Sequence, residues 1–283
     1  MSRNHGGTSS RTSRALSREL DRIDRKGYSA YKDILGPWEL GALTLFVDRV
    51  QPDPYAPPSR MRVRLPLEET GIPGELYATP VRRTALEDLL ARSFREVLHR
   101  RHQGRERITI AAGGQEMLER TVLRLDAEAV EVRMNVELPA RGRTILGRRA
   151  SELLLELLPA VARESLSWAS LPRERAHAWL RWAENRRALE EALEERGYVA
   201  FVANHSLLPR KSGASQEPLS REEAVPFASP PSLEVEIPLP HPPGGPYGEE
   251  PLLQGMALPE GITLIVGGGF HGKSTLLDAL ARG

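Results

Sequence analysis

The chain has 283 residues, of which 40% are hydrophobic and 27% are charged, and its formal net charge is +1. This composition predicts a folded protein long enough for two domains and excludes a chain that is disordered throughout. No run of about 18 apolar residues occurs, so no membrane span is expected, and the absence of cysteine excludes disulfides and zinc–thiolate sites and fits a cytoplasmic location.

The first 225 residues are expected to form two regions. Residues 1–13 are rich in serine and arginine and lack the apolar segment of a secretory signal, so we expect a disordered basic tail. Residues 14–225 are predicted to form an α+β domain, because helical and strand patterns mix without strict alternation. Its predicted helices, each with an apolar face, lie within residues 14–35, 84–101, 151–158 and 172–196. Its predicted strands cover residues 43–50, 60–65, 107–112, 120–126, 129–138 and 198–203.

Prolines and glycines mark the ends of several of these elements. The segment 51–59 is rich in proline and cannot continue the strand before it, because proline has no N–H donor. Asp53, between two prolines, is best explained as a turn residue. Pro159 is expected to break or restart the leucine-rich helix, and Gly197 to end the helix before it.

Arginine side chains are the second recurrent feature of this region. The candidate nucleic-acid contacts are Arg60, Arg62, Arg64, Arg141 and Arg143. The first three alternate with apolar residues along one predicted strand and therefore share a face. Such clusters either bind along a phosphate backbone or form a solvated charged face. The second interpretation is open because arginine is the usual cation of this chain, in which only four of the 39 basic residues are lysines. A module that binds nucleic acid, RNA or DNA, is kept as the alternative function.

Residues 226–283 are predicted to begin a second domain, with a short strand at 233–239. The run 262–266 is continuously apolar and largely β-branched, which suits a strand buried on both faces of a parallel sheet. It is followed by eight residues that fit the pattern G-x-x-x-x-G-K-[ST], and then by leucines at helical spacing. A strand, a glycine turn and a helix start thus occur in the order that a phosphate-binding loop requires.

The phosphate-binding loop, or P-loop, is the most specific signal in the chain. Its glycines let backbone N–H groups turn toward phosphate oxygens, and the positive end of the following helix faces the same anion. Lys273 is predicted to reach the β- and γ-phosphates as the catalytic residue, and the Ser274 hydroxyl is predicted to ligate Mg²⁺. His271 either approaches the γ-phosphate or occupies a position where only the backbone matters. The residues predicted to bind nucleotide are Gly267, Gly268, Gly269, Phe270, His271, Gly272, Lys273, Ser274 and Thr275.

Over nearly its whole length the chain resembles the predicted ATPases of the ABC class. The resemblance lies in GYSAYKDILG (27–36), DRVQPDPYAPPSRMRV (48–63), YVAFVANHSLLPRKSG (198–213), VPFASPPSLEVEIPLP (225–240) and GMALPEGITLIVGGGFHGKSTLL (255–277). The last segment is the most specific, because this family has a histidine directly before Gly272 and Lys273. One departure is Asn204-His205-Ser206, where the family usually has a turn of the Asp-Gly-Ser type.

The resemblance implies a protein without transmembrane segments that binds ATP at Lys273 and Mg²⁺ at Ser274. In such enzymes an aromatic residue often stacks on the adenine, and Tyr247 either has this role or is an ordinary loop aromatic. The resemblance also implies an acidic magnesium-binding strand, a catalytic carboxylate and a signature motif after the P-loop, with a second subunit, so a homodimer is expected.

None of those later motifs occurs between Ser274 and Gly283. We therefore expect an α+β N-terminal domain followed by the first strand, the P-loop and the helix start of a truncated P-loop NTPase domain of the ABC type. On this interpretation the chain is the N-terminal portion of a longer ATPase and is inactive by itself. The substrate on which the ATPase acts is not indicated by the sequence.

Overall fold

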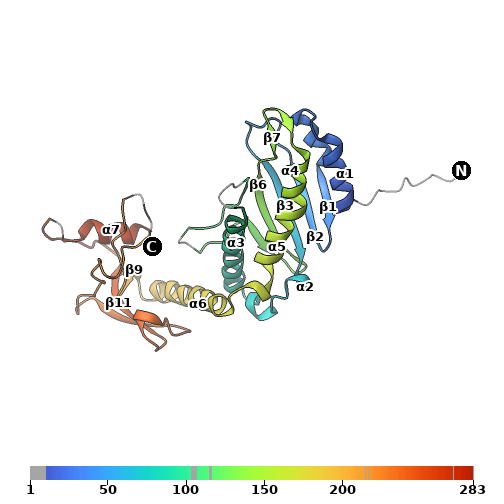
Figure 1. Ribbon diagram of the computed structural model, residues 1–283. Helices are drawn as coiled ribbons and strands as arrows, with labels where there is room; N and C mark the ends of the chain where they lie inside the picture. Colours follow the sequence, from blue (N-terminus) through green and yellow to red (C-terminus); the bar gives the residue numbers. More distant parts are fainter. Residues whose placement is uncertain are drawn as a thin grey trace. The chain divides into compact units, whose positions relative to one another are not determined.

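The computed structural model describes residues 11–102, 107–114, 117–213, 215, 217–269 and 271–282. It divides the chain into two compact units, Met1–Trp179 and Leu180–Gly283, which are called the first and the second unit below (Figure 1). Residues 1–10 of the predicted tail lie outside the described residues. Arg11 already belongs to the fold, because its carbonyl accepts a hydrogen bond from the Glu39 N–H at 2.8 Å.

The first unit is built around an antiparallel sheet with the strand order β1-β2-β3-β6-β4, and β5 also pairs with β6. The strands are β1 (Gly36–Leu40), β2 (Leu43–Arg49), β3 (Ser59–Pro66), β4 (Ile108–Thr109), β5 (Leu123–Leu125) and β6 (Ala129–Val136). A separate hairpin pairs β7 (Ala140–Arg141) with β8 (Thr144–Ile145). The predicted mixture of helices and sheet is therefore confirmed.

Helices α3 and α5 lie side by side over one face of this sheet (Figure 1). The helices of the first unit are α1 (Ser13–Ile23), α2 (Leu67–Thr70), α3 (Pro80–His102), α4 (Gly147–Ser151), α5 (Leu158–Leu166) and the beginning of α6 (Arg173–Glu195). Shorter helical turns are η1 (Tyr28–Ile34), η2 (Gly74–Tyr77), the π-helical η3 (Glu152–Leu157) and η4 (Trp168–Ser170). The predicted break or restart at Pro159 is not seen, because the helical backbone continues from Gly147 to Leu166. Pro159 instead lies where the π-helical η3 passes into α5.

The sequence alternation of β3 decides which face of the sheet is covered. Met61, Val63 and Leu65 are buried, whereas the side chains between them lie on the opposite face. The same alternation occurs in β2, where Leu45 and Val47 are buried. Burying these apolar side chains under the helices stabilises the unit by roughly 1.5–3 kcal/mol for each large side chain.

The second unit contains a three-stranded antiparallel sheet with the order β10-β11-β9. Its elements are the end of α6, β9 (Tyr198–Ala203), β10 (Glu234–Pro238), η5 (Gly245–Tyr247), β11 (Leu252–Pro259) and α7 (Lys273–Arg282). Gly197 follows α6 with φ +67°, a left-handed conformation that ends the helix, as the sequence predicted. The core of the second unit is small, and Leu276 and Leu280 of α7 pack against Val202 and Met256 in it.

The assignment of residues 198–203 to the sheet of the N-terminal domain is wrong. These residues form β9, which pairs with β11 in the second unit, with Val202 opposite Met256. The partner strand β11 contains a glycine and ends in a proline, so its sequence does not resemble a strand. The structural boundary accordingly lies between Trp179 and Leu180, whereas the sequence placed it after residue 225.

The buried strand predicted at residues 262–266 is also absent from the structure. These residues have no regular secondary structure, and the Leu264 side chain is 81% exposed. Among the described residues no strand pairs with this segment. A strand that is apolar on both faces is stable only when neighbouring strands satisfy its backbone groups and helices cover its faces.

Within the described part of the chain, no helix combines the length and the apolar character needed to cross a membrane.

Candidate phosphate-binding site

The P-loop, residues 267–272, leads from the extended segment into α7, and its fourth residue, Phe270, lies outside the described residues. Gly272 has φ +76°, a left-handed conformation that glycine adopts without a steric penalty. The helix begins at the next residue, Lys273. A side chain at position 272 would strain the turn that brings the loop to the start of the helix.

Lys273 reaches back across the loop. Its Nζ donates a hydrogen bond to the Gly267 carbonyl oxygen at 2.8 Å and a second one to the Gly268 carbonyl oxygen. An ammonium group has three N–H donors, so one donor remains for a phosphate oxygen. The lysine therefore holds the loop curled and keeps its positive charge at the centre of the curl.

His271, near the end of the loop, folds back onto Gly268, near its beginning. Its Nδ1 accepts a hydrogen bond from the Gly268 N–H at 3.2 Å. A Cβ atom added at Gly268 would lie 3.0 Å from His271 Cε1, which is tighter than ordinary van der Waals contact. A side chain at position 268 would therefore require the imidazole ring to shift by a few tenths of an ångström.

The first turn of α7 supplies the remaining polar groups. Helix N-termini leave backbone N–H groups without intrahelical partners, and the helix dipole makes this end positive. The first turn of α7 contains no acidic side chain that would oppose an anion. Ser274 is exposed there, whereas Thr275 is half-buried and lines a hollow of about 260 Å³ with Arg210 and Asp278.

Mg²⁺ fits this site only together with phosphate. Magnesium prefers six oxygen ligands and usually takes one or two from the protein and the rest from phosphates and water. The Ser274 hydroxyl can supply one such oxygen. Among the described residues no group of three or more His, Asp or Glu side chains is placed to hold a metal by itself.

The structure places the three strand arginines on the face of the sheet opposite to α3 and α5, and two of them are engaged by carboxylates. Arg62 donates to both oxygens of Asp48, at 2.7 and 2.8 Å, and to Glu131 at 2.8 Å. Arg64 donates to Glu128 at 2.9 Å and to Asp126 at 3.3 Å. This pairing neutralises much of the positive charge that a phosphate backbone would require.

The two remaining candidate arginines belong to the β7–β8 hairpin. Arg141 is exposed at the end of β7, and Arg143 forms an ion pair with Asp53 at 2.9 Å. The other carboxylate oxygen of Asp53 accepts a hydrogen bond from the Tyr55 N–H at 3.1 Å. This bond confirms that Asp53 shapes a turn.

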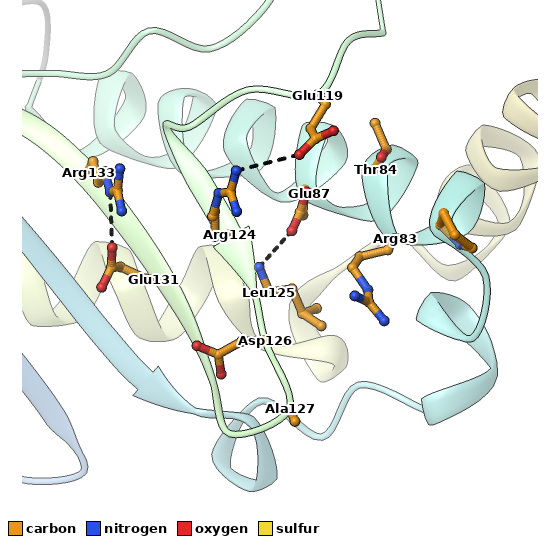
Figure 2. Close-up of a pocket in the computed structure, with 11 residues that line it drawn as sticks. Arg83, Thr84, Glu87, Glu119, Arg124, Leu125, Asp126, Ala127, Glu131 and Arg133 are labelled. Atoms are coloured by element: carbon orange, nitrogen blue, oxygen red, sulfur yellow. Dashed lines mark hydrogen bonds and ion pairs between the residues drawn. The ribbon is translucent and has the colours of Figure 1, made fainter.

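No sequence pattern pointed to the pocket of about 550 Å³ between the start of α3 and the β5–β6 hairpin (Figure 2). Glu87 lines it, and burial raises the pKa of this carboxyl above its ordinary value, although its Oε1 accepts a hydrogen bond from the Leu125 N–H at 2.8 Å. Its charged residues of both signs are Arg83, Glu87, Glu119, Arg124, Asp126, Glu131 and Arg133. Arg124 pairs with Glu119 and Arg133 with Glu131, so the three arginines and four carboxyl groups leave only a small excess of negative charge in the pocket.

Tyr247 lies in the loop between β10 and β11. Its ring packs edge-to-face against Trp182, with the ring centroids 6.3 Å apart. This contact explains the aromatic residue through packing within the second unit.

Two family models match consecutive parts of the chain. The model described as the N-terminal part of ATPases of the ABC class matches residues 13–168. The model of the ABC ATPase P-loop domain matches residues 172–283. No curated protein matches the chain. Since the two matches together cover the α+β region and the curled loop of Lys273, the chain belongs to the ATPases of the ABC class, a family of ATP-binding P-loop proteins.

Proposed function

We propose that residues 267–275 form the nucleotide site of this ABC-class ATPase and hold the phosphates of ATP with Mg²⁺. The observation that carries the proposal is the position of Lys273, whose Nζ spans the Gly267 and Gly268 carbonyl oxygens. This geometry leaves the third ammonium donor and the N–H groups at the start of α7 for the same anion.

Each part of the loop has a distinct role in this proposal. Lys273 neutralises charge on the β- and γ-phosphates, and its ion pair with them is strong because both partners are charged. The backbone N–H groups from Gly272 to Thr275 bind phosphate oxygens. The Ser274 hydroxyl ligates Mg²⁺, which when bound neutralises further phosphate charge.

Hydrolysis requires more than this cradle. Transfer of a phosphoryl group to water needs a positioned water molecule and a fully coordinated metal. The described residues after the loop form α7, and the acidic residue among them is Asp278. Asp278 lines the same hollow as Thr275. We propose that an acidic strand, a signature motif and a second copy of the protein complete the site, and that residues 1–283 alone do not turn over ATP.

The test compares two lysine variants of the protein expressed from its complete gene. In Lys273→Ala the affinity for a fluorescent ATP analogue should fall about tenfold to a hundredfold, since a hydrogen bond to a charged group contributes about 1.5–3 kcal/mol. The matched control is Lys32→Ala, which removes an exposed lysine of the first unit and should leave the affinity unchanged.

A phosphate-release assay on the polypeptide 1–283 tests the second half of the proposal, with no turnover expected. Equal affinity of wild type and Lys273→Ala would overturn the assignment of the site. Turnover by residues 1–283 that depends on Lys273 would overturn the claim that further residues are needed.

A further inference from the structure

We propose that His271 is a positioning residue of the P-loop, and that it acts by holding the Gly268 peptide group rather than by contacting the γ-phosphate. This inference rests on the proposed nucleotide site and specifies what the histidine does there. It replaces the two roles that the sequence left open, a phosphate contact or a position where only the backbone matters.

Both backbone polar groups of Gly268 form hydrogen bonds within the loop. Its N–H donates to His271 Nδ1 at 3.2 Å, and its carbonyl oxygen accepts from Lys273 Nζ. Both polar groups of this residue are therefore used inside the loop and are not offered to a phosphate. The neighbouring carbonyl of Gly267 also binds Lys273, at 2.8 Å, so the lysine and the histidine together fix the first turn of the loop.

The His271 ring also lies close to the Gly268 backbone. This contact and the hydrogen bond from the Gly268 N–H to His271 Nδ1 are together called the clamp. A Cβ atom at Gly268 would lie 3.0 Å from His271 Cε1 and 3.4 Å from Nδ1. The imidazole thus lies directly against the Gly268 backbone, and a larger residue at position 268 would displace the ring. For Nδ1 to accept this hydrogen bond, the proton of the neutral ring must be on Nε2.

The clamp orders part of the loop before a ligand binds. A glycine-rich segment loses much backbone entropy when it is ordered around an anion. A bond that already fixes Gly268 reduces the part of that cost which nucleotide binding must offset. The clamp should therefore strengthen the binding of any nucleotide whose phosphates use the loop, whether or not a γ-phosphate is present.

Two amide side chains distinguish the clamp from a direct contact between His271 and the γ-phosphate. In asparagine the acceptor oxygen is bonded to the γ-carbon, as Nδ1 is in histidine, so His271→Asn can accept the Gly268 N–H. In His271→Gln the acceptor is one carbon farther out and cannot reach the same place. His271→Ala removes the acceptor altogether.

The experiment measures the affinities of fluorescent ATP and ADP analogues for these variants, in the protein expressed from its complete gene. We expect His271→Ala to weaken both nucleotides about fivefold, the factor that one hydrogen bond contributes. His271→Asn should bind within about twofold of wild type, and His271→Gln should resemble the alanine variant. Loss of affinity for ATP alone would overturn the inference in favour of a γ-phosphate contact, and so would the absence of rescue by asparagine.

A second measurement needs no nucleotide and separates this inference from the proposed function. Hydrogen exchange at the Gly268 amide should become faster in His271→Ala and return to the wild-type rate in His271→Asn. An exchange rate that is the same in all variants would overturn the clamp even if Lys273→Ala loses ATP. If Lys273→Ala keeps its ATP affinity while Gly268 exchange follows the expected order, the proposed function fails and the clamp stands as a structural contact.

Discussion

Asp88 is a buried carboxylate that forms an ion pair with Arg92. Its side chain has no exposed surface, and it accepts a hydrogen bond from Arg92 Nε at 2.7 Å. Arg92 in turn donates to the Gly114 carbonyl oxygen at 2.5 Å and lies over the ring of Trp179, 5.0 Å from its centroid. The pair thus joins α3, the loop after β4 and the start of α6 within the first unit.

Replacing Asp88 by alanine should lower the free energy of unfolding of the first unit by about 3–5 kcal/mol. The reason is that a buried guanidinium would lose the carboxylate that compensates for its desolvation. The matched control is Glu96→Ala, which breaks the exposed pair with Arg175 in the same unit and should cost less than about 0.5 kcal/mol. Urea denaturation followed by circular dichroism measures both, and similar losses in the two variants would contradict the prediction.

Tyr28 and Tyr31 make the first unit sensitive to alkaline pH. Both rings are buried, and burial raises the pKa of each phenol above its ordinary value. The Tyr31 hydroxyl donates to the Pro139 carbonyl oxygen at 2.7 Å, and the Tyr28 hydroxyl donates to the Leu138 carbonyl oxygen at 3.3 Å. Ionisation would therefore both charge a buried ring and remove a donor.

The free energy of unfolding of the first unit should fall as the pH rises above about 10, the pKa of an unfolded tyrosine. Because the folded pKa is the higher one, the folded state binds more protons there, and stability present below pH 10 is lost as the pH approaches the folded pKa. Urea denaturation between pH 8 and pH 11 measures this slope.

Tyr31→Phe should cost about 1 kcal/mol at neutral pH through the lost hydrogen bond, and should make the alkaline slope shallower. The control is Tyr55→Phe, because Tyr55 is largely exposed and its removal should leave the slope as it is. An unchanged slope in Tyr31→Phe would show that its ionisation does not contribute.

At the scale of elements, the turn after β9 depends on a left-handed residue. His205 has φ +68°, and its N–H donates to the Phe227 carbonyl oxygen at 2.7 Å. The Phe227 N–H returns a hydrogen bond to the Ser206 carbonyl oxygen at 2.9 Å. A residue with a side chain therefore occupies a left-handed position in this turn, where glycine would carry no steric penalty.

His205→Gly should raise the free energy of unfolding of the second unit by about 0–1.5 kcal/mol. Glycine relieves a left-handed strain of about 1–2 kcal/mol and loses about 0.5–1 kcal/mol through the entropy of the unfolded chain. His205→Val should instead destabilise the unit by about 1–2 kcal/mol, because a β-branched residue does not tolerate this φ. Thermal unfolding measures both, and a glycine variant as unstable as the valine variant would show that the imidazole itself matters.

At the scale of the whole molecule, two apolar segments of similar composition have opposite fates. Phe201 and Val202 of β9 pair with Ala257 and Met256 of β11. Residues 262–266 have no strand partner among the described residues, and Ile262 is fully exposed. The difference lies in the neighbours that each segment finds and not in its own sequence.

Native-state hydrogen exchange of residues 1–283 should therefore protect the β9 ladder and leave the amides of 264–266 close to their intrinsic rates. Amides in a paired strand exchange only when the ladder opens, whereas unpaired and exposed amides exchange directly. Protection at 264–266 equal to that of β9 would mean that this segment is part of the folded core.

The sequence by itself determined the elements whose pattern lies within one stretch of chain. The apolar faces of α3 and α6, the strict alternation of β3 and the P-loop glycines before Lys273 are all readable in that way. Each depends on residues a few positions apart, so the period of the pattern matches the geometry of the element. The residues proposed to form the nucleotide site belong to the same class, because they follow one another along the chain.

Only the tertiary structure decided which strands pair and which charges meet. The strand β1 contains Pro37, and β11 contains Gly255, so neither has a strong strand pattern, yet each is held by a neighbour. The engagement of Arg62 by Asp48 and Glu131 likewise joins residues from three strands. Pairing of this kind is set by hydrogen bonds and contacts between segments that are distant in sequence, and local periodicity contains no information about the partner.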